Sequence, residues 1–272
     1  MERTALITGC SSGIGRATAE AFLEEGWTVV ATARETSDIV DLEAQGAITR
    51  RLDVTKPAQC RTVVENAIEE TGRLDCLVNN AGFAQFGPVE DVPTRLVEAQ
   101  FDVNLLGPHR LIRAALPHMR EAESGTIVNV SSVSGRLSAP GMGVYSSSKA
   151  ALESLSDALR VEAGAFDVDV ALVEPGPVET QFDERAQSSL DELDRRDAYA
   201  DIYATLEDWD VLGSMGSVPP ERVASVILEA GVSTDPQARY TVGPGSRYLS
   251  LARFLPDGLR DAIFSLVRRV AG

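Results

Sequence analysis

The chain has 272 residues, of which 44% are hydrophobic, and it carries a formal net charge of −16 at pH 7. The apolar content is enough for a substantial core, which excludes a disordered or fibrous protein. The negative charge repels nucleic acid and anionic lipid, so neither is an expected partner. The N-terminal segment lacks a basic stretch followed by a long apolar run, and no apolar run reaches the roughly 20 residues that span a bilayer. We therefore expect a cytoplasmic protein without a membrane partner.

The positive charge is almost all arginine, because Lys56 and Lys149 are the only lysines. An acid-rich, lysine-poor composition is typical of proteins from salt-loving organisms, although codon usage produces the same bias. Cys10, Cys60 and Cys76 have spacings that match neither a disulfide framework nor a zinc site. We expect them to be buried thiols in a reducing compartment.

The first predicted elements are a buried strand at Arg3–Thr8, a glycine-rich turn at Gly9–Gly15 and a helix at Arg16–Glu25. Such a turn lets the backbone approach a pyrophosphate, and the helix N-terminus presents unpaired N–H groups to the anion. A glycine cluster alone is more often a plain turn, but a second strand at Thr28–Ala33 strengthens the pattern. The predicted nucleotide loop comprises Gly9, Ser11, Ser12, Gly13, Ile14 and Gly15.

The end of the second strand indicates the type of cofactor. NAD sites usually place an acid here to receive the ribose 2′-hydroxyl, whereas this chain has Ala33 followed by Arg34. A guanidinium binds a 2′-phosphate with two parallel hydrogen bonds, so the sequence favours NADP(H) over NAD(H). A solvated surface arginine without a ligand is the competing interpretation.

The alternation of strands and helices continues, with strands at Ala47–Leu52 and Leu74–Asn79 around a helix at Lys56–Thr71. Residues that directly follow parallel strands lie where open sheets bind ligands. We therefore add to the cofactor site Asp53, Val54, Asn80, Ala81 and Gly82. Turn formation alone is an alternative explanation for the asparagine and glycine.

A long helical region is predicted from Thr94 to Ala122, and it contains Asn104. An asparagine inside a helix is locally unfavourable, which indicates a specific role such as holding a water or bending the helix. A capped turn is the alternative. His109 and His118, in the same region, have no partners at metal-ligand spacing, so we predict no metal site.

A strand at Thr126–Val130 delivers Ser132, and a helix from Tyr145 to about Ala163 places Tyr145 and Lys149 one turn apart on the same face. A phenol has a reference pKa of about 10, and a neighbouring cation lowers that value, which makes the phenol a usable proton donor or base. Ser132 is placed to hydrogen-bond a substrate oxygen. Tyr-x-x-x-Lys by itself is an ordinary helix pattern, so this interpretation depends on the nucleotide motifs around it.

A sixth strand at Val168–Val173 leads into the segment PGPVET, residues 175–180. The alternation leaves no linker and predicts a single α/β domain over residues 1–272. The predicted fold is a Rossmann-like, doubly wound parallel sheet of about seven strands with helices on both faces.

The chain after Thr180 has less regular patterns. Residues 181–218 combine acids with apolar residues at helical spacing, which predicts amphipathic helices that pack on the sheet. A helix at Glu221–Ala230 and a strand at Tyr240–Val242 are predicted next. Residues 246–272 are predicted to form a C-terminal helical extension of two short helices, broken at Pro256.

These features resemble the short-chain dehydrogenase/reductase family over about residues 3–180, through the motifs TGCSSGIG, NNAG and PGPVET and the Tyr-x-x-x-Lys pair. The resemblance implies that Tyr145 is the general acid/base and that Ser132 holds the substrate oxygen. It also implies that Lys149 tunes Tyr145 and binds the nicotinamide ribose, and that Asn104 holds a water in a proton relay. The implied catalytic set is therefore Asn104, Ser132, Tyr145 and Lys149.

The resemblance also extends the cofactor site to Tyr145, Lys149, Pro175, Gly176, Val178 and Thr180. Substrate contacts are expected from residues beside these motifs, namely Phe83, Gln85, Val133, Met142 and Pro177. The resemblance alone implies that residues 181–218 cover the substrate. It implies hydride transfer between NADP(H) and a carbonyl or secondary alcohol of a hydrophobic substrate, such as a ketone or a steroid-like or retinoid-like compound. It further implies a homodimer or homotetramer. The alternatives are a lyase or epimerase on the same scaffold and a non-catalytic NADP-sensing protein, and the intact tyrosine and lysine argue against both.

Overall fold

The computed structural model describes residues 2–207, 216–246 and 254–271. Its centre is a sheet of seven parallel strands in the order β3-β2-β1-β4-β5-β6-β7. The strands are β1 (Thr4–Thr8), β2 (Thr28–Ala33), β3 (Ile48–Arg51), β4 (Cys76–Asn79), β5 (Gly125–Val130), β6 (Val168–Pro175) and β7 (Arg239–Val242). The order reverses between β1 and β4, so a crevice forms beyond the carboxyl ends of these strands. The doubly wound parallel sheet predicted from the sequence is confirmed.

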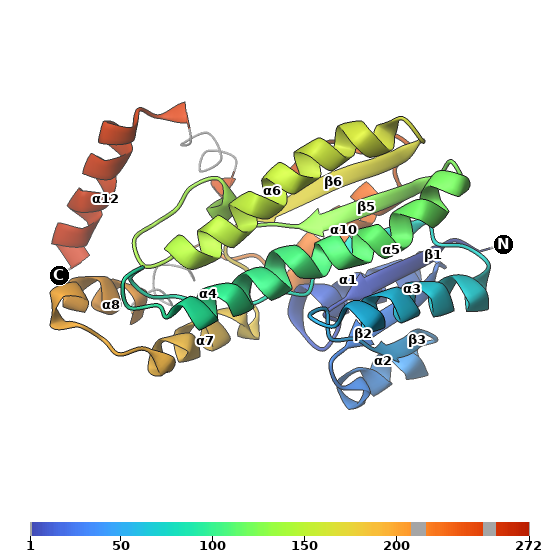
Figure 1. The fold of residues 1–272 in the computed structure, drawn as a ribbon, viewed down its shortest axis with the longest axis horizontal. Coiled ribbons are helices and arrows are strands. Elements are labelled where there is room, and N and C mark those ends of the chain that lie inside the picture. Colours follow the sequence, from blue (N-terminus) through green and yellow to red (C-terminus); the bar gives the residue numbers. More distant parts are fainter. Residues whose placement is uncertain (1, 208–215, 247–253, 272) are drawn as a thin grey trace.

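Helices cover both faces of the sheet, as Figure 1 shows. On one face lie α1 (Gly13–Glu24) and α10 (Pro220–Val232), and on the other lie α3 (Pro57–Thr71), α5 (Gly107–Glu121) and α6 (Gly143–Gly164). The remaining helices in the described residues are α2 (Val40–Ala44), α4 (Thr94–Phe101), α7 (Gln181–Ser188), α8 (Ala200–Glu207) and α12 (Asp257–Ala271). Helix α1 begins earlier than predicted, inside the glycine-rich turn, so the turn itself supplies the first turn of the helix.

The side chains of β1 show how the two layers are held together. Ala5 and Ile7 pack into the cluster under α1 and α10, whereas Leu6 packs into the cluster under α3 and α5, and all three are fully buried. Each buried Leu or Ile contributes about 1.5–3 kcal/mol relative to an exposed one. The three cysteines are buried free thiols, as expected.

The predicted helix from Thr94 to Ala122 is interrupted by a π-helical turn over Asp102–Leu106, between α4 and α5. Pro108 explains the position of this turn. It has no N–H to bond the Asn104 carbonyl in an α-helix, and its ring would clash with that carbonyl. The Gly107 N–H donates to the Asp102 carbonyl, five residues earlier, and the Arg110 guanidinium donates to the same oxygen at 3.1 Å. A π-helical turn thus stands at Asn104, where the sequence led us to expect a bend, a bound water or a capped turn.

Of the predicted substrate-covering segment, residues 181–207 and 216–218 are described, and residues 181–207 gather with α12 at one end of the molecule (Figure 1). They bury a third apolar cluster that includes Leu190 and Leu206. Asp91, whose side chain is fully buried, anchors them to the body: it accepts a 2.7 Å hydrogen bond from the Tyr203 hydroxyl and pairs with Arg196. Residues 208–215 lie outside the described residues.

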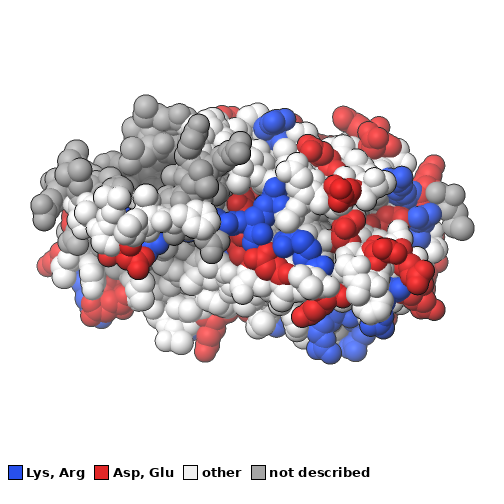
Figure 2. Space-filling model, turned by 90° about the horizontal axis from the view of Figure 1, so that it is seen from above, with Lys and Arg blue, Asp and Glu red and all other residues white. Residues whose placement is uncertain are grey.

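The predicted C-terminal extension is described from residue 254 onward, and its first helical piece falls largely outside the described residues. Helix α12 begins directly after Pro256, at the predicted break. In the described ranges, no helix combines the length and apolarity needed to cross a bilayer. Acidic side chains are spread over the face drawn in Figure 2, interleaved with small groups of basic ones.

Candidate active site

The glycine-rich loop forms a close-fitting cradle at the amino end of α1. Gly9 and Gly13 have φ angles of +76° and +55°, which favour glycine. A Cβ at Gly15 would collide with the Gly9 carbonyl and the Asn80 amide. Ser12 precedes the helix without a side-chain cap, and the first turn of α1 contains no acid. The N–H groups of this turn are therefore available to an anion such as a pyrophosphate.

The turn after β4 supports that cradle. The Asn80 amide donates to the carbonyls of Thr8 (2.9 Å) and Gly9 (3.3 Å). The backbone N–H groups of Asn80 and Ala81 both donate to the Thr8 hydroxyl at 3.0 Å. The asparagine therefore fixes the nucleotide loop in place, a role more specific than turn formation.

A single cavity of about 630 Å³ runs from this loop in both directions. One end is lined by Arg34 and Asp53, and the other by Phe83, Met142 and Pro177. Every predicted site residue lines it except Gly15, Asn104 and Gln85. The volume is within the roughly 300–1,000 Å³ that small-molecule sites occupy.

Gln85 was expected to contact substrate, but the structure places it elsewhere. It is buried, and its side-chain amide donates to the carbonyls of Phe86 (2.8 Å) and Ser189 (3.2 Å). Its own N–H donates to the Gln100 side chain at 2.6 Å. With its amide engaged by backbone carbonyls outside the cavity, Gln85 joins the loop after β4 to the covering segment.

Asn104 lies behind the cavity wall in the π-helical turn. Its side-chain oxygen accepts from the Phe83 N–H at 3.2 Å, and its amide donates to the Phe83 carbonyl at 3.0 Å and to the Ser148 hydroxyl at 3.1 Å. The side chain therefore joins the loop after β4 to helix α6. The water predicted at Asn104 remains a prediction.

Tyr145 and Ser132 meet at the inner part of the cavity. Ser132 begins a 3₁₀ turn (Val133–Gly135) after β5, and its hydroxyl accepts from the Ser134 N–H at 3.1 Å. Burial raises the pKa of Tyr145 to about 12, while a hydrogen bond with Ser132 opposes the increase. The sequence led us to expect a lowered pKa, but burial is the largest effect, and the charge of Asp183 raises the pKa of Tyr145 further. The phenol is therefore protonated at neutral pH and available as a proton donor.

Lys149 lies one turn further along α6 and is also buried. Its ammonium donates to the Val130 carbonyl at 2.8 Å. Burial lowers its pKa to about 8, and the charge of Glu153 partly opposes this. Lys149 is therefore cationic at neutral pH but close to titration.

Several lining residues were not predicted from the sequence. The ring of Phe182 lies 5.8 Å from the ring of Tyr145, and the ring of Phe86 lies 6.4 Å from it. Phe182 follows Thr180, whose hydroxyl caps α7 by accepting from the Phe182 N–H at 3.2 Å. Recognising Thr180 as an N-cap would have placed Phe182 beside the cofactor segment. Phe86 has no comparable signal in the sequence.

The sequence matches known proteins over most of its length. A model of the short chain dehydrogenase family matches residues 3–191. The chain is 36% identical to the NADPH-dependent 3-dehydrocapnine reductase of Ornithobacterium rhinotracheale, over 96% of this chain and 96% of that protein. It is 34% identical to the 3-ketodihydrosphingosine reductase of Bacteroides thetaiotaomicron, over 93% of each chain.

A solved structure agrees with these matches. A short-chain dehydrogenase from Streptomyces avermitilis superposes with a TM-score of 0.83 at 34% identity. The alignment covers 100% of this chain and 98% of that one. The likeness thus includes the covering segment and the C-terminal region as well as the sheet.

Proposed function

The chain belongs to the short-chain dehydrogenase/reductase family, and on that premise we propose that it is an NADPH-dependent reductase of ketone groups on hydrophobic substrates. The observation that carries this proposal is the position of Tyr145. Its protonated phenol contacts Ser132 and lies near Lys149, in the part of the nucleotide cavity where apolar side chains gather. A proton donor beside a nucleotide cradle and an apolar chamber suits reduction of an apolar ketone.

The cavity residues fit a nicotinamide dinucleotide. The cradle of Gly9, Gly13 and Gly15 has no room for side chains and would hold the pyrophosphate. Asp53 and Val54 at one end would hold the adenine. Pro175, Gly176, Val178 and Thr180 would hold the nicotinamide, and Tyr145 and Lys149 its ribose. When bound, the cofactor supplies the hydride that reduces the carbonyl carbon.

Arg34 supports NADPH over NADH. It follows β2, is exposed, and lines the cavity beside Ser11 and Asp53. Within the described part of the chain its guanidinium has no ion-pair partner, whereas Arg50 pairs with Glu70. It is thus placed to bind a 2′-phosphate.

In the proposed reaction, each residue has one task. Tyr145 donates its proton to the carbonyl oxygen as that oxygen gains negative charge. Ser132 hydrogen-bonds the same oxygen and stabilises the charge. Lys149, as a cation, stabilises the phenolate that Tyr145 becomes. Asn104 would hold a water through which the proton of Tyr145 is replaced.

The apolar lining supports a hydrophobic substrate. Phe83, Phe86, Met142 and Phe182 line the catalytic end, and Val133 and Pro177 complete it. Both sequence relatives are named as reductases, one of 3-dehydrocapnine and one of 3-ketodihydrosphingosine. We therefore extend the expected substrates, which include steroid-like and retinoid-like compounds, to 3-keto compounds of this kind.

The test is a substrate panel. NADPH and NADH oxidation would be followed with 3-ketodihydrosphingosine, a steroid ketone, retinal and a cyclic ketone, using the Tyr145→Phe variant as the blank. We expect NADPH-dependent turnover of at least one apolar substrate by the wild-type protein and not by the variant. NADPH binding without turnover of any substrate would contradict the proposal and favour an NADP-sensing role.

A further inference from the structure

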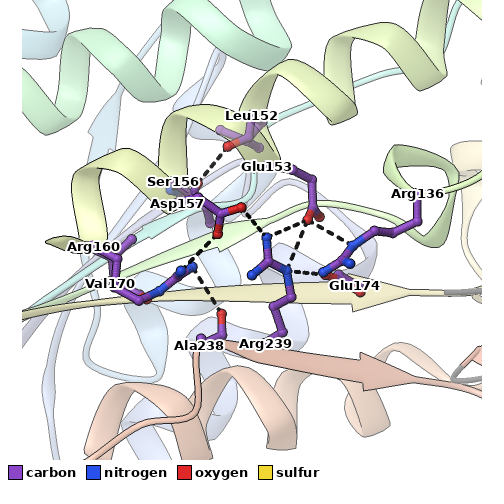
Figure 3. A network of polar contacts seen from close by, with 11 residues as sticks. Arg136, Leu152, Glu153, Ser156, Asp157, Arg160, Val170, Glu174, Ala238 and Arg239 are labelled. Atoms are coloured by element: carbon purple, nitrogen blue, oxygen red, sulfur yellow. Dashed lines mark hydrogen bonds and ion pairs between the residues drawn. The ribbon is translucent and has the colours of Figure 1, made fainter. Parts of the chain in front are cut away.

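Four charged side chains, two of them buried glutamates and two of them partly buried arginines, lie beside the active site without a role in the mechanism above. They form the ion cluster Arg136, Glu153, Glu174 and Arg239, shown in Figure 3. Arg136 lies 2.7 Å from Glu174 and 3.1 Å from Glu153, and Arg239 lies 3.1 Å from Glu174 and 3.3 Å from Glu153. Each carboxylate therefore contacts both guanidiniums, and the four charges balance.

The cluster is largely removed from water. The side chains of Glu174, Glu153 and Arg136 are 0%, 8% and 11% exposed. Burial and the charge of Glu153 raise the pKa of Glu174, and both guanidiniums oppose this. Because desolvation offsets most of the attraction in a buried ion pair, stability alone is a weak reason for such a cluster. A stronger reason for the cluster is that it fixes the relative positions of the segments that its residues come from.

Three of the four residues come from elements that carry active-site groups. Arg136 directly follows the 3₁₀ turn that Ser132 begins, and Glu153 lies one turn after Lys149 on α6. Glu174 precedes Pro175, where the cofactor segment starts. The cluster therefore joins the serine turn, the catalytic helix and the cofactor segment at one point.

Gly135 shows how closely the serine turn lies on α6. A Cβ at this position would be 3.2 Å from the Lys149 carbonyl carbon and 3.2 Å from the Glu153 Cγ. A small shift of the turn is therefore opposed on one side by the backbone of α6 and on the other by the Arg136 ion pairs.

We propose that Glu153 and Arg136 are positioning residues, which clamp the turn carrying Ser132 against α6 and so fix the Ser132 hydroxyl relative to the Tyr145 phenol. The inference rests on the proposed function, because it assumes that the reaction occurs at Tyr145. Neither Glu153 nor Arg136 touches the reacting atoms.

Glu153 also acts on Lys149 through its charge. Glu153 on α6 is the charge that raises the pKa of Lys149, and Arg136 and Arg239 pair with Glu153 from the serine turn and β7. Without the Glu153 charge, Arg136 would keep Glu174 and Arg239 would keep Glu174 and Asp157, and the pKa of Lys149 would fall further.

The test compares Glu153→Gln with Asp157→Asn. Asp157 is the matched control because it also pairs with Arg239, at 2.7 Å, but lies at the outer edge of the cluster with 47% of its side chain exposed. For Glu153→Gln we expect kcat to fall at least about tenfold with the KM for NADPH almost unchanged, because small misplacements of reacting groups cost up to about a hundredfold. The basic limb of its pH profile should move to lower pH. Asp157→Asn should change neither quantity.

Wild-type kcat and pH profile in Glu153→Gln would overturn the inference, as would equal losses in Asp157→Asn. If Glu153→Gln folds poorly, the double variant Arg136→Gln with Glu153→Gln restores the charge balance. We expect the double variant to regain thermal stability while kcat stays low. A double variant with wild-type kcat would also overturn the inference.

Hydrogen exchange measures how firmly the serine turn is held, and it does not depend on turnover. We expect faster amide exchange in residues 131–136 of Glu153→Gln, with unchanged exchange in α1 and in Asp157→Asn. Unchanged exchange in residues 131–136 would overturn the clamp. Faster exchange there in Glu153→Gln would support the clamp even if the wild-type protein oxidised no NADPH with any substrate, and that absence of turnover would contradict the proposed function alone.

Discussion

The ammonium of Lys149 donates a 2.8 Å hydrogen bond to the carbonyl of Val130, the last residue of β5. This bond joins the catalytic helix to the strand that delivers Ser132. It therefore holds the Lys149 side chain beside the serine turn, one helical turn from Tyr145.

Tyr145→Phe should reduce turnover by about 10²–10⁴-fold, because it removes the proton donor. NADPH binding, measured by fluorescence titration, should be almost unchanged because the ring remains. Tyr199→Phe is the control, since its hydroxyl donates to Glu90 at 2.6 Å outside the cavity. A Tyr145→Phe variant with most of the wild-type rate would refute the mechanism.

Arg34→Ala should raise the KM for NADPH roughly 10- to 100-fold while changing the KM for NADH little, because a hydrogen bond to a charged group contributes about 1.5–3 kcal/mol. Steady-state kinetics with both cofactors measure this difference. Arg50→Ala is the matched control, since Arg50 pairs with Glu70 away from the cavity. Equal effects of Arg34→Ala on both cofactors would contradict the assignment of the 2′-phosphate site.

Reduction should slow as the pH rises above about 8, the lowered pKa of Lys149. Lys149 is cationic below this value and neutral above it, so its support for the phenolate is lost with increasing pH. Tyr145 has a pKa of about 12 and does not produce the first basic limb. The pH dependence of kcat/KM measures the limb, with circular dichroism to confirm that the protein stays folded. A rate that stays constant well above this pH would contradict the role of Lys149.

Gly15→Ala should lower the free energy of unfolding by about 1–3 kcal/mol, because overpacking forces neighbours apart. The added methyl would meet the Gly9 carbonyl and the Asn80 amide, so NADPH binding should weaken as well. Gly164→Ala is the control, because a Cβ there meets nothing within 4 Å. Urea denaturation measures both variants. A Gly15→Ala variant as stable as the control would show that the cradle has room to relax.

Thermal stability should increase with salt if the net charge of −16 reflects a high-salt habitat, because salt screens the repulsion between carboxylates. Melting curves from low to molar salt measure this. An unchanged melting temperature would favour codon usage as the origin of the lysine-poor composition.

The fold was predicted well because strands and helices are marked by patterns of neighbouring residues. Each strand lies within two residues of its predicted ends, since short apolar runs between turns suffice to mark a buried parallel strand. Most of the predicted site residues line one cavity, because parallel strands bring the residues after their carboxyl ends to one edge of the sheet. The cytoplasmic location, the homo-oligomer and the salt adaptation stay predictions.

The features that escaped prediction depend on contacts between distant segments. Gln85 was assigned to the cavity from its position beside a motif, but it bonds Ser189, a residue more than a hundred positions away. The pKa of Tyr145 depends on burial under Phe182 and Phe86, which spacing within one helix does not reveal. The ion cluster likewise assembles from four separate elements.

The Asp91 anchor lies apart from the predicted catalytic residues. Those residues come from the π-helical turn, the end of β5 and α6, whereas Arg196 and Tyr203 of the covering segment bind a carboxylate outside the cavity. Ser189 attaches the same segment to the loop after β4 through Gln85 and Phe86. Because Phe182 of this segment also lies against the ring of Tyr145, a change in the segment would alter the surroundings of the phenol together with the wall of the chamber.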